Sequence, residues 1–212
     1  MDDKKYWTEY YSTHSKPTGA STFAEFILPK LDENKRLIEL GCGNGRDSVF
    51  FSQNNINVVA VDQVNDEIDF LNENYKNENI DFVCDDFTNL AETSSVLIKN
   101  NDFDYVYSRF TFHSIEEAKE NRTLDWIADK LNKDACFLLE ARSLKDPMFK
   151  QGEALSETEN FTTHYRRYMD LDKITEKLES RGFEILFKIE DNDLAVYKDD
   201  NPYVIRIIAK KL

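Results

Sequence analysis

The stretch RLIELGCGNGRDS, residues 36–48, joins a strand-like run to a polar, helix-compatible run through three glycines at alternate positions. Glycine tolerates positive φ and has no Cβ, so the backbone can turn sharply here and come close to a ligand. A dinucleotide-binding turn, G-x-G-x-x-G, needs its third glycine or alanine where this chain has Arg46. Glu39, two positions before the first glycine, suits a ligand amine better than a pyrophosphate. The turn therefore favours a nucleotide cofactor other than a dinucleotide.

Apolar runs surround this turn at the spacing of an α/β fold. They predict strands at 36–40, 56–62, 80–85, 103–109 and 136–142. The amphipathic stretches between them predict helices at 46–54, 64–75 and 115–131. Strands that alternate with helices favour a mostly parallel sheet covered on both faces. Beyond a helix at 171–183, three more runs predict antiparallel strands at one sheet edge, namely 183–191, 194–198 and 203–212.

The N-terminal residues have a different character from the rest of the chain. The aromatic segment YWTEYYSTH precedes an amphipathic helix expected at 17–31, and we expect both to lie outside the core sheet. We therefore divide the chain into a helical cover segment, 1–31, and one α/β domain, 32–212. The first residues carry no apolar run of the kind found in secretory signals. No stretch approaches the roughly 20 apolar residues of a membrane helix.

Composition narrows the classes of partner. With 41 Asp and Glu against 27 Lys and Arg, the formal net charge is −14, which disfavours binding to nucleic acid. A local basic patch is still compatible with a small anion. The cysteines, Cys42, Cys84 and Cys136, stand far apart and form no C-x-x-C pair. We expect reduced core thiols in a cytoplasmic protein, with neither disulfides nor a metal site.

Polar residues follow the strands where a ligand of an open α/β sheet binds, at the carboxyl ends. Asp62 ends the second strand, and its carboxylate can accept hydrogen bonds from both hydroxyls of a ribose. Asp86 follows the third strand and can accept from an adenine amino group. The backbone N–H of Phe87 can reach a ring nitrogen of the same base. Three neighbouring strand ends are thus predicted to contact one nucleoside.

These motifs together resemble those of class I S-adenosylmethionine-dependent methyltransferases. LIELGCGNGRD, VVAVD, CDDF and FDYVYSRFTFHSI occur in the family's order, and the resemblance extends over about residues 20–212. It implies a Rossmann-like, seven-stranded, mostly parallel sheet with an antiparallel C-terminal strand. It also implies S-adenosylmethionine as the methyl donor and S-adenosylhomocysteine as its product. The cofactor-binding residues implied are Glu39, Gly41, Cys42, Gly43, Asp62, Gln63, Asp86, Phe87 and Ser108.

The methyl acceptor must be inferred from the residues beside the methyl position. Arg109 and His113 follow the fourth strand and are the catalytic candidates. A cationic lining in such an acidic protein favours a small anionic acceptor, because guanidinium groups bind phosphate or carboxylate oxygens bidentately. An ionised oxygen needs no base, whereas a sugar hydroxyl would need His113 or His164 as one. The substrate-binding candidates are Tyr11, Arg142, His164, Tyr165, Arg166 and Arg167.

Adjacent arginines cannot share one face, so we expect one of Arg166 and Arg167 to face the cavity and the other to face solvent or an acid. SRFTFHSI, EARSLKD, HYRRY and NPYVIRIIAKK resemble small bacterial enzymes of capsule and surface-polysaccharide clusters, some linked to O-methyl phosphoramidate. GCGNGRDS also resembles tellurite-resistance-type methyltransferases. A small-molecule O-methyltransferase is the leading hypothesis. A thiol or tellurium methyltransferase and a non-catalytic subunit with this fold are the alternatives. The sequence does not indicate an oligomeric state.

Overall fold

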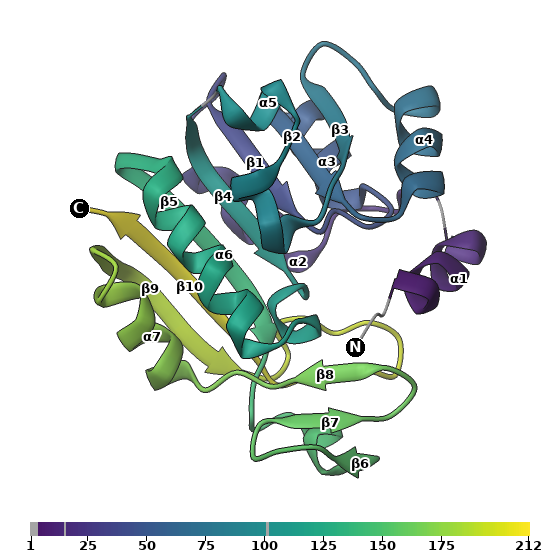
Figure 1. The fold of residues 1–212 in the computed structure, drawn as a ribbon, viewed down its shortest axis with the longest axis vertical. Helices are drawn as coiled ribbons and strands as arrows, with labels where there is room; N and C mark the ends of the chain where they lie inside the picture. Colours follow the sequence, from purple (N-terminus) through teal and green to yellow (C-terminus); the bar gives the residue numbers. More distant parts are fainter. Residues whose placement is uncertain (1–3, 15, 101) are drawn as a thin grey trace.

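A seven-stranded sheet forms the centre of the computed structural model, which describes residues 4–14, 16–100 and 102–212. Its strands are β1 (Arg36–Leu40), β2 (Asn57–Asp62), β3 (Ile80–Cys84), β4 (Phe103–Arg109), β5 (Leu131–Arg142), β9 (Phe183–Asp191) and β10 (Val204–Lys211). The order across the sheet is β3-β2-β1-β4-β5-β10-β9 (Figure 1). β10 is antiparallel to β5 and β9, whereas β1 to β5 run parallel. The predicted sheet, with its antiparallel C-terminal strand, is confirmed.

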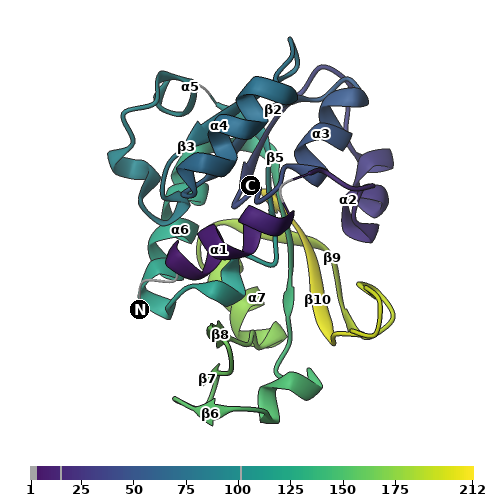
Figure 2. The ribbon, with the colours of Figure 1, turned by 90° about the vertical axis from the view of Figure 1, so that its right-hand side faces the viewer.

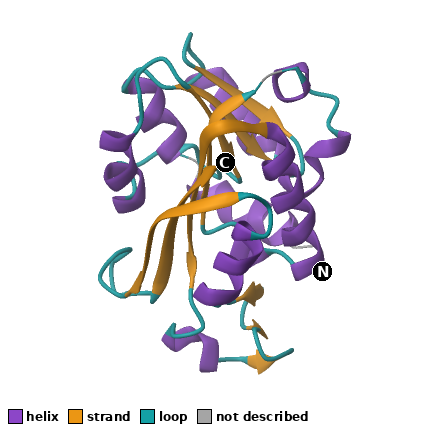
Figure 3. Ribbon diagram, turned by 90° about the vertical axis from the view of Figure 1, so that its left-hand side faces the viewer, coloured by secondary structure: helices purple, strands orange, loops and turns teal. Residues whose placement is uncertain are grey.

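Helices cover both faces of this sheet (Figure 3). One face holds α2 (Thr22–Ile27), α3 (Arg46–Gln53) and α4 (Asn65–Asn74), and the other holds α5 (Val96–Lys99), α6 (Glu117–Lys130) and α7 (Leu171–Glu179). Phe51 and Leu71 are fully buried on the first face, and Leu124 and Leu178 on the second. Because both faces are covered, the parallel strands are apolar at almost every position. None of the helices in the described ranges is long and apolar enough to cross a membrane.

The predicted amphipathic helix at 17–31 is shorter in the structure and contributes to the core. It comprises α2 and the 3-10 turn η1 (Leu28–Lys30). Ser21 caps α2 by accepting from the N–H of Ala24 at 3.0 Å. Phe23 and Ile27 are fully buried and pack with residues of β1 and β2. This segment therefore lies outside the sheet but inside one of its two hydrophobic layers.

A second, small sheet lies beside the carboxyl ends of the main strands and was not predicted. It consists of β6 (Glu153–Ala154), β7 (Glu159–Phe161) and β8 (Tyr165–Arg167), which pair antiparallel. Strands of two or three residues are too short to show a hydrophobic period. Helix α1 (Lys4–His14) lies between α4 and this small sheet (Figure 2). The remaining 3-10 turns are η2 (Phe87–Glu92), η3 (Phe112–Ser114) and η4 (Pro147–Lys150).

Two predictions from the sequence are wrong in detail. The run 194–198 is a loop between β9 and β10, and Tyr197 forms only an isolated bridge with Asp200. Val196 and Tyr197 are exposed, so the run lacks the alternation against a buried sheet face that selects a strand. Cys84 is exposed at the end of the edge strand β3, and Cys136 packs only at the rim of the core. Of the three cysteines, only Cys42 is a core thiol, although none of the three forms a disulfide.

Candidate active site

A cavity of about 840 Å³ opens at the carboxyl ends of the parallel strands. From the roles that the sequence predicts, we call the part around the glycine turn after β1 the donor half and the part around the ends of β4 and β5 the acceptor half. The predicted residues that line the donor half are Glu39, Gly41, Cys42, Gly43, Asp62, Gln63 and Phe87. Those that line the acceptor half are Arg109, His113, Arg142, His164 and Arg166, whereas Tyr11 of α1, predicted to bind substrate, lies against Gly43 of the turn. Asp86, Ser108, Tyr165 and Arg167 do not line the cavity.

The glycine turn has a geometry that other residues would not tolerate. Gly41 and Gly43 have φ values of +76° and +54°. A Cβ on Gly41 would overlap the methyl group of Thr111, and a Cβ on Gly43 would overlap the hydroxyl of Tyr11. Gly45, at φ +71°, begins α3 in the left-handed conformation. The turn therefore keeps its backbone bare toward the cavity, as the sequence predicts for a close approach to a ligand.

Asp62, at the end of β2, stabilises the turn from the neighbouring strand. Its Oδ2 accepts from the N–H of Gly43 at 3.0 Å, and its Oδ1 accepts from the N–H of Val64 at 3.0 Å. The residue is 8% exposed, and that exposure is toward the cavity that it lines. The carboxylate therefore joins the glycine turn to the start of α4 and still faces the donor half.

Glu39 is a buried carboxyl group beside the turn. It is 4% exposed, accepts a short hydrogen bond from the hydroxyl of Ser48, and forms no ion pair with any described residue. Burial, and then the charge of Asp47, raise its pKa well above the usual value. A positive charge in the cavity would stabilise the ionised form of this carboxyl group, because it would offset the cost of desolvation.

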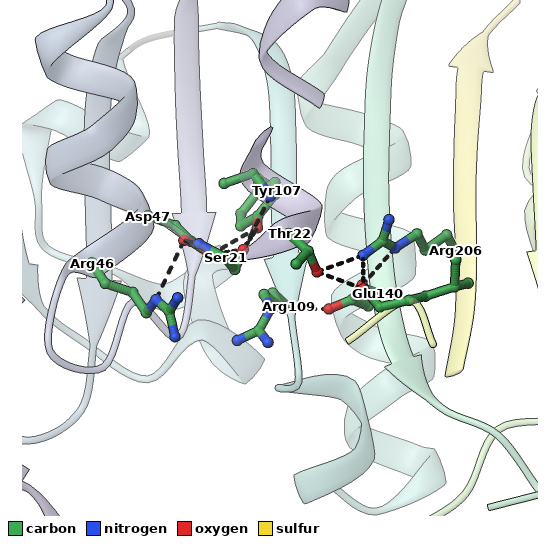
Figure 4. Close-up of polar contacts among 10 residues, drawn as sticks. Ser21, Thr22, Arg46, Asp47, Tyr107, Arg109, Glu140 and Arg206 are labelled. Carbon is green, nitrogen blue, oxygen red and sulfur yellow. Dashed lines mark hydrogen bonds and ion pairs between the residues drawn. The ribbon is translucent and has the colours of Figure 1, made fainter. Parts of the chain in front are cut away.

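A buried network around Asp47 fixes the N-terminal segment against the donor half (Figure 4). Asp47 accepts from the N–H and the hydroxyl of Ser21, at 2.8 Å and 2.7 Å. It also accepts from the hydroxyl of Tyr107 on β4 at 2.8 Å. Arg46 approaches it at 3.8 Å and lines the cavity. One carboxylate thus ties together α2, α3 and β4.

Two predicted cofactor residues lie behind the cavity wall. The Oδ1 of Asp86 accepts from the N–H of Thr88 at 2.8 Å and from its hydroxyl at 2.7 Å, so it caps η2. Ser108 is fully buried and shares a short hydrogen bond with the hydroxyl of Thr111. Phe87, the other residue predicted to contact the adenine, does line the cavity.

Buried carboxylates hold the arginines of the acceptor half in place. Arg109 donates from Nε to Glu140 Oε1 at 2.9 Å, and Arg206 donates from Nε to Glu140 Oε2 at 2.6 Å (Figure 4). Arg206 also donates to Thr22 and to the carbonyl oxygen of Leu194, at 3.0 Å and 2.7 Å. Glu140, at the end of β5, therefore connects β4, β10, α2 and the 192–203 loop.

Arg142 and Arg167 are also paired with acids. Arg142 donates to Asp146 Oδ2 at 2.8 Å and makes a short ion pair with Asp200. Arg167 is 6% exposed, makes a short ion pair with the buried Glu120, and donates to a backbone carbonyl oxygen of the η3–α6 connection at 3.1 Å. These contacts join the small sheet to α6.

Arg166 points the other way and lines the cavity. It donates to the hydroxyl of Thr162 and forms no ion pair within the described parts of the chain. Its neighbour Tyr165 lies outside the cavity and donates to Glu159 Oε1 at 2.6 Å. The expected division of the adjacent arginines is confirmed as geometry, with Arg166 toward the cavity and Arg167 toward an acid.

Two imidazoles lie near Arg166. His113 is 5% exposed, and its Nδ1 has no hydrogen-bond partner among the described residues. Burial, and then the charges of Arg142 and Arg166, lower its pKa well below the usual value. His164 stacks on the ring of Tyr6, with centroids 4.2 Å apart, and burial lowers its pKa to about 4. Both imidazoles are therefore neutral at physiological pH.

A protein-family model described as "Methyltransferase domain" matches residues 13–187. The chain belongs to this family. Solved structures of the same fold include an Anabaena variabilis methyltransferase, with TM-score 0.73, 17% identity, and coverage of 100% of this chain and 96% of that one. A TehB-like methyltransferase of Corynebacterium glutamicum has TM-score 0.67 and 16% identity, and the coverage is 99% and 98%. Both are described as dependent on S-adenosylmethionine.

A third structure of this fold is the Burkholderia thailandensis 1,6-didemethyltoxoflavin-N1-methyltransferase, solved with its substrate and S-adenosylhomocysteine. It has TM-score 0.66 and 18% identity, and the match covers 89% of this chain and 76% of that one. No curated protein sequence is similar enough to match this chain. The fold of this methyltransferase-family chain is thus that of the S-adenosylmethionine-dependent enzymes.

Some residues that shape the site of this methyltransferase-family chain were not found from the sequence. Ser21 and Asp47 are polar residues near the glycine turn, and only their contact across 26 positions shows that they act together. Phe110 follows β4 with φ +57°, and its ring lies 4.3 Å from the guanidinium of Arg109 and 5.7 Å from that of Arg142. A bulky residue in this conformation has no sequence signal.

Proposed function

We propose that the protein transfers a methyl group from S-adenosylmethionine to a small acceptor that carries a negative charge. One observation supports this best. A single cavity joins a bare glycine turn and two acidic strand ends to a second half that contains Arg166 and two neutral imidazoles. The first half suits a nucleoside with an amino-acid tail, and the second suits an anion.

The donor half fits this cofactor chemically. Glu39 is a buried carboxyl group with no ion pair to a described residue, and an ammonium group would supply the missing charge. Asp62 faces the cavity as an acceptor for hydroxyl groups. In this proposal Glu39, Gly41 and Gly43 hold the methionine end, Asp62 and Gln63 the ribose, and Phe87 the adenine. S-adenosylmethionine supplies a methyl group on a sulfonium that is already activated.

The acceptor half then has to orient its ligand and exclude water. The lowered pKa values of His113 and His164 make both imidazoles weak bases. An oxygen that is already ionised, as in a phosphate or carboxylate, needs no base and therefore fits better than a sugar hydroxyl. We assign His113 to hydrogen bonding with the acceptor and Arg109 to the electrostatics beside it.

We propose an acceptor oxygen in preference to sulfur or tellurium, because guanidinium and imidazole groups bind hard anions. Phosphorylated precursors of surface polysaccharides, phosphoramidates among them, are the first compounds to assay. We place the reaction in the cytoplasm, where the three free cysteines would stay reduced. Transfer to thiols or tellurite with no loss in Arg166→Met would replace the proposed acceptor with the soft-nucleophile alternative.

Calorimetric titration with S-adenosylhomocysteine tests the donor. Asp62→Ala removes a carboxylate that would hold two ribose hydroxyls, which costs roughly 1.5–3 kcal/mol, or about a 10- to 150-fold loss of affinity. Asp81→Ala, which removes only a surface ion pair with Lys76, is the matched control and should bind as the unmodified protein does. No binding to the unmodified protein would contradict the proposal and favour the non-catalytic subunit.

A further inference from the structure

The arginines of the cavity differ in what neutralises them. Those that line it are Arg46, Arg109, Arg142 and Arg166. The first three approach carboxylates, which are respectively Asp47 at 3.8 Å, Glu140 at 2.9 Å, and Asp146 at 2.8 Å together with Asp200. Arg166 has only the hydroxyl of Thr162. Arg166 is therefore the one of these four arginines that approaches no carboxylate among the described residues.

The surroundings of Arg166 favour pairing of its guanidinium with an anionic ligand over solvation by water. The residue is half-buried, and burial lowers its pKa. Lys16, another cation of the lining, is exposed to solvent. His113 and His164 lie within electrostatic range of Arg166, and both are neutral. An anion at Arg166 would gain a guanidinium that no carboxylate neutralises, beside the His113 imidazole that lines the same cavity.

Aromatic side chains form another part of the cavity wall. Tyr6, Trp7, Tyr10 and Tyr11 of α1 line the cavity, and Phe110 and Tyr197 line it from other elements. The rings of Trp7 and Tyr11 are stacked, with centroids 6.0 Å apart, and Tyr6 is stacked on His164. Tyr10 and Tyr197 are 40% and 57% exposed at the mouth. Flat aromatic faces of this kind bind a planar ring by offset or edge contact.

We propose that the acceptor is a planar ring that carries one anionic group. The anion pairs with Arg166 and accepts from His113, and the ring lies against the aromatic side chains of α1. This inference rests on the proposed function for its place in the reaction, and the geometry adds the ring and places the anion at Arg166. It makes a bare inorganic anion a poor ligand, because such an anion leaves the aromatic wall uncovered.

Four probes separate the ring from the charge. Benzoate has both, benzamide has the ring alone, cyclohexanecarboxylate has the charge on a non-planar ring, and inorganic phosphate has only charge. Dissociation constants come from titrations followed by amide chemical shifts, which reach millimolar binding, with and without saturating S-adenosylhomocysteine. We expect benzoate to bind more tightly than the other three probes. Its affinity should exceed that of benzamide about 10-fold or more, because only benzoate makes a charge-assisted hydrogen bond with the ring in place.

Variants assign these preferences to residues. Arg166→Met should lower the affinity for benzoate about 10-fold or more and leave that for benzamide unchanged. Tyr6→Leu should reduce the preference for benzoate over cyclohexanecarboxylate. Arg122→Met removes an arginine from α6, outside this cavity, and should change neither affinity. The fold of each variant is checked by its thermal unfolding.

Each outcome decides between the proposals. Equal affinities for benzoate and benzamide, or an Arg166→Met protein with unchanged preference, would overturn the ring-anion site. S-adenosylhomocysteine binding with no affinity for any probe would overturn it as well and leave the methyl donor in place. Probe binding that depends on Arg166 without S-adenosylhomocysteine binding would overturn the methyl-transfer function and retain the ring-anion site.

Discussion

The donor and acceptor halves of the cavity are built in different ways. The donor half comes mainly from one stretch of chain, from Glu39 to Phe87, which follows three neighbouring parallel strands, and Tyr11 of α1 packs on its glycine turn. The acceptor half collects α1, the ends of β4 and β5, the segment that leads into β8, and the 192–203 loop. Parallel register places the first set of residues automatically. Long-range ion pairs have to place the second.

The charges of the two halves differ correspondingly. In the donor half Asp62 and Glu39 are acidic groups served by backbone N–H and hydroxyl donors. In the acceptor half Glu120 and Glu140 are buried acids that hold arginines. The donor half therefore depends on backbone shape, whereas the acceptor half depends on matched charges. Substitutions that separate shape from charge test this contrast.

Removing a buried charge should give the largest effect, and it breaks the acceptor half. Arg167→Met leaves Glu120 buried with Lys177, at 2.7 Å, as its remaining partner. We expect a loss of about 3 kcal/mol in the free energy of unfolding, measured in urea. The adjacent Arg166→Met, which breaks no ion pair, should stay within about 1 kcal/mol. Equal losses at the two positions would show that the buried pair is not what anchors the small sheet.

Filling the glycine turn breaks the donor half. Gly41→Ala places a methyl group on Thr111 at a φ of +76°, which costs about 1–3 kcal/mol and should weaken S-adenosylhomocysteine binding about 10-fold or more. Gly19→Ala adds its methyl group in open space and is the control, with a change below about 0.5 kcal/mol. Unfolding and calorimetric titration measure the two effects separately. Unchanged affinity in Gly41→Ala would mean that the turn does not approach the donor.

Acid should lower the free energy of unfolding through His164 of the acceptor half. Its pKa is lowered from the usual 6.5 to about 4 in the folded protein, so the unfolded chain takes up the proton first. Stability should fall as the pH drops from about 6.5 to 4, by about 1–2 kcal/mol after solvent screening. His164→Gln should reduce this slope between the two values, and the part that remains belongs to His113, whose pKa is also lowered. A His164 imidazole that titrates near 6.5 by NMR would contradict the burial beneath Tyr6.

Raising the pH from about 4.5 to 7 should lower the free energy of unfolding slightly, through Glu67 on α4. This side chain is 4% exposed, and its Oε1 has no hydrogen-bond partner among the described residues. Burial, and then Asp62, raise its pKa from 4.5 to about 7. The stabilisation present below pH 4.5 is therefore lost as the pH rises toward 7. The free energy of unfolding of Glu67→Gln should exceed that of the unmodified protein by about 1 kcal/mol at pH 8. At pH 4 the two proteins should be equally stable.

Local patterns predicted the main sheet well, because each strand carries its own apolar run, and they placed Glu39, Asp62 and Phe87 at strand ends that line one cavity. The acceptor half was predicted as a set of residues and not as an arrangement. Nothing near Arg142 in sequence indicates that Asp200 neutralises it, and nothing near Arg167 indicates Glu120. The run LAVYK has the composition of a strand, but no sheet face is left to bury it. Pairing partners and free edges are properties of the whole chain.

The place of β10 sets an order for the chain's maturation on the ribosome. β9 is synthesised first, yet its hydrogen-bonded neighbour in the sheet is β10. Residues 183–191 are therefore synthesised before the strand that joins them to β5, at rates of about 5–20 residues per second. Arg206 arrives on that same late strand, and with it the second partner of Glu140. The acceptor half is thus completed by one of the last elements of the domain to be translated, after the donor half has been synthesised.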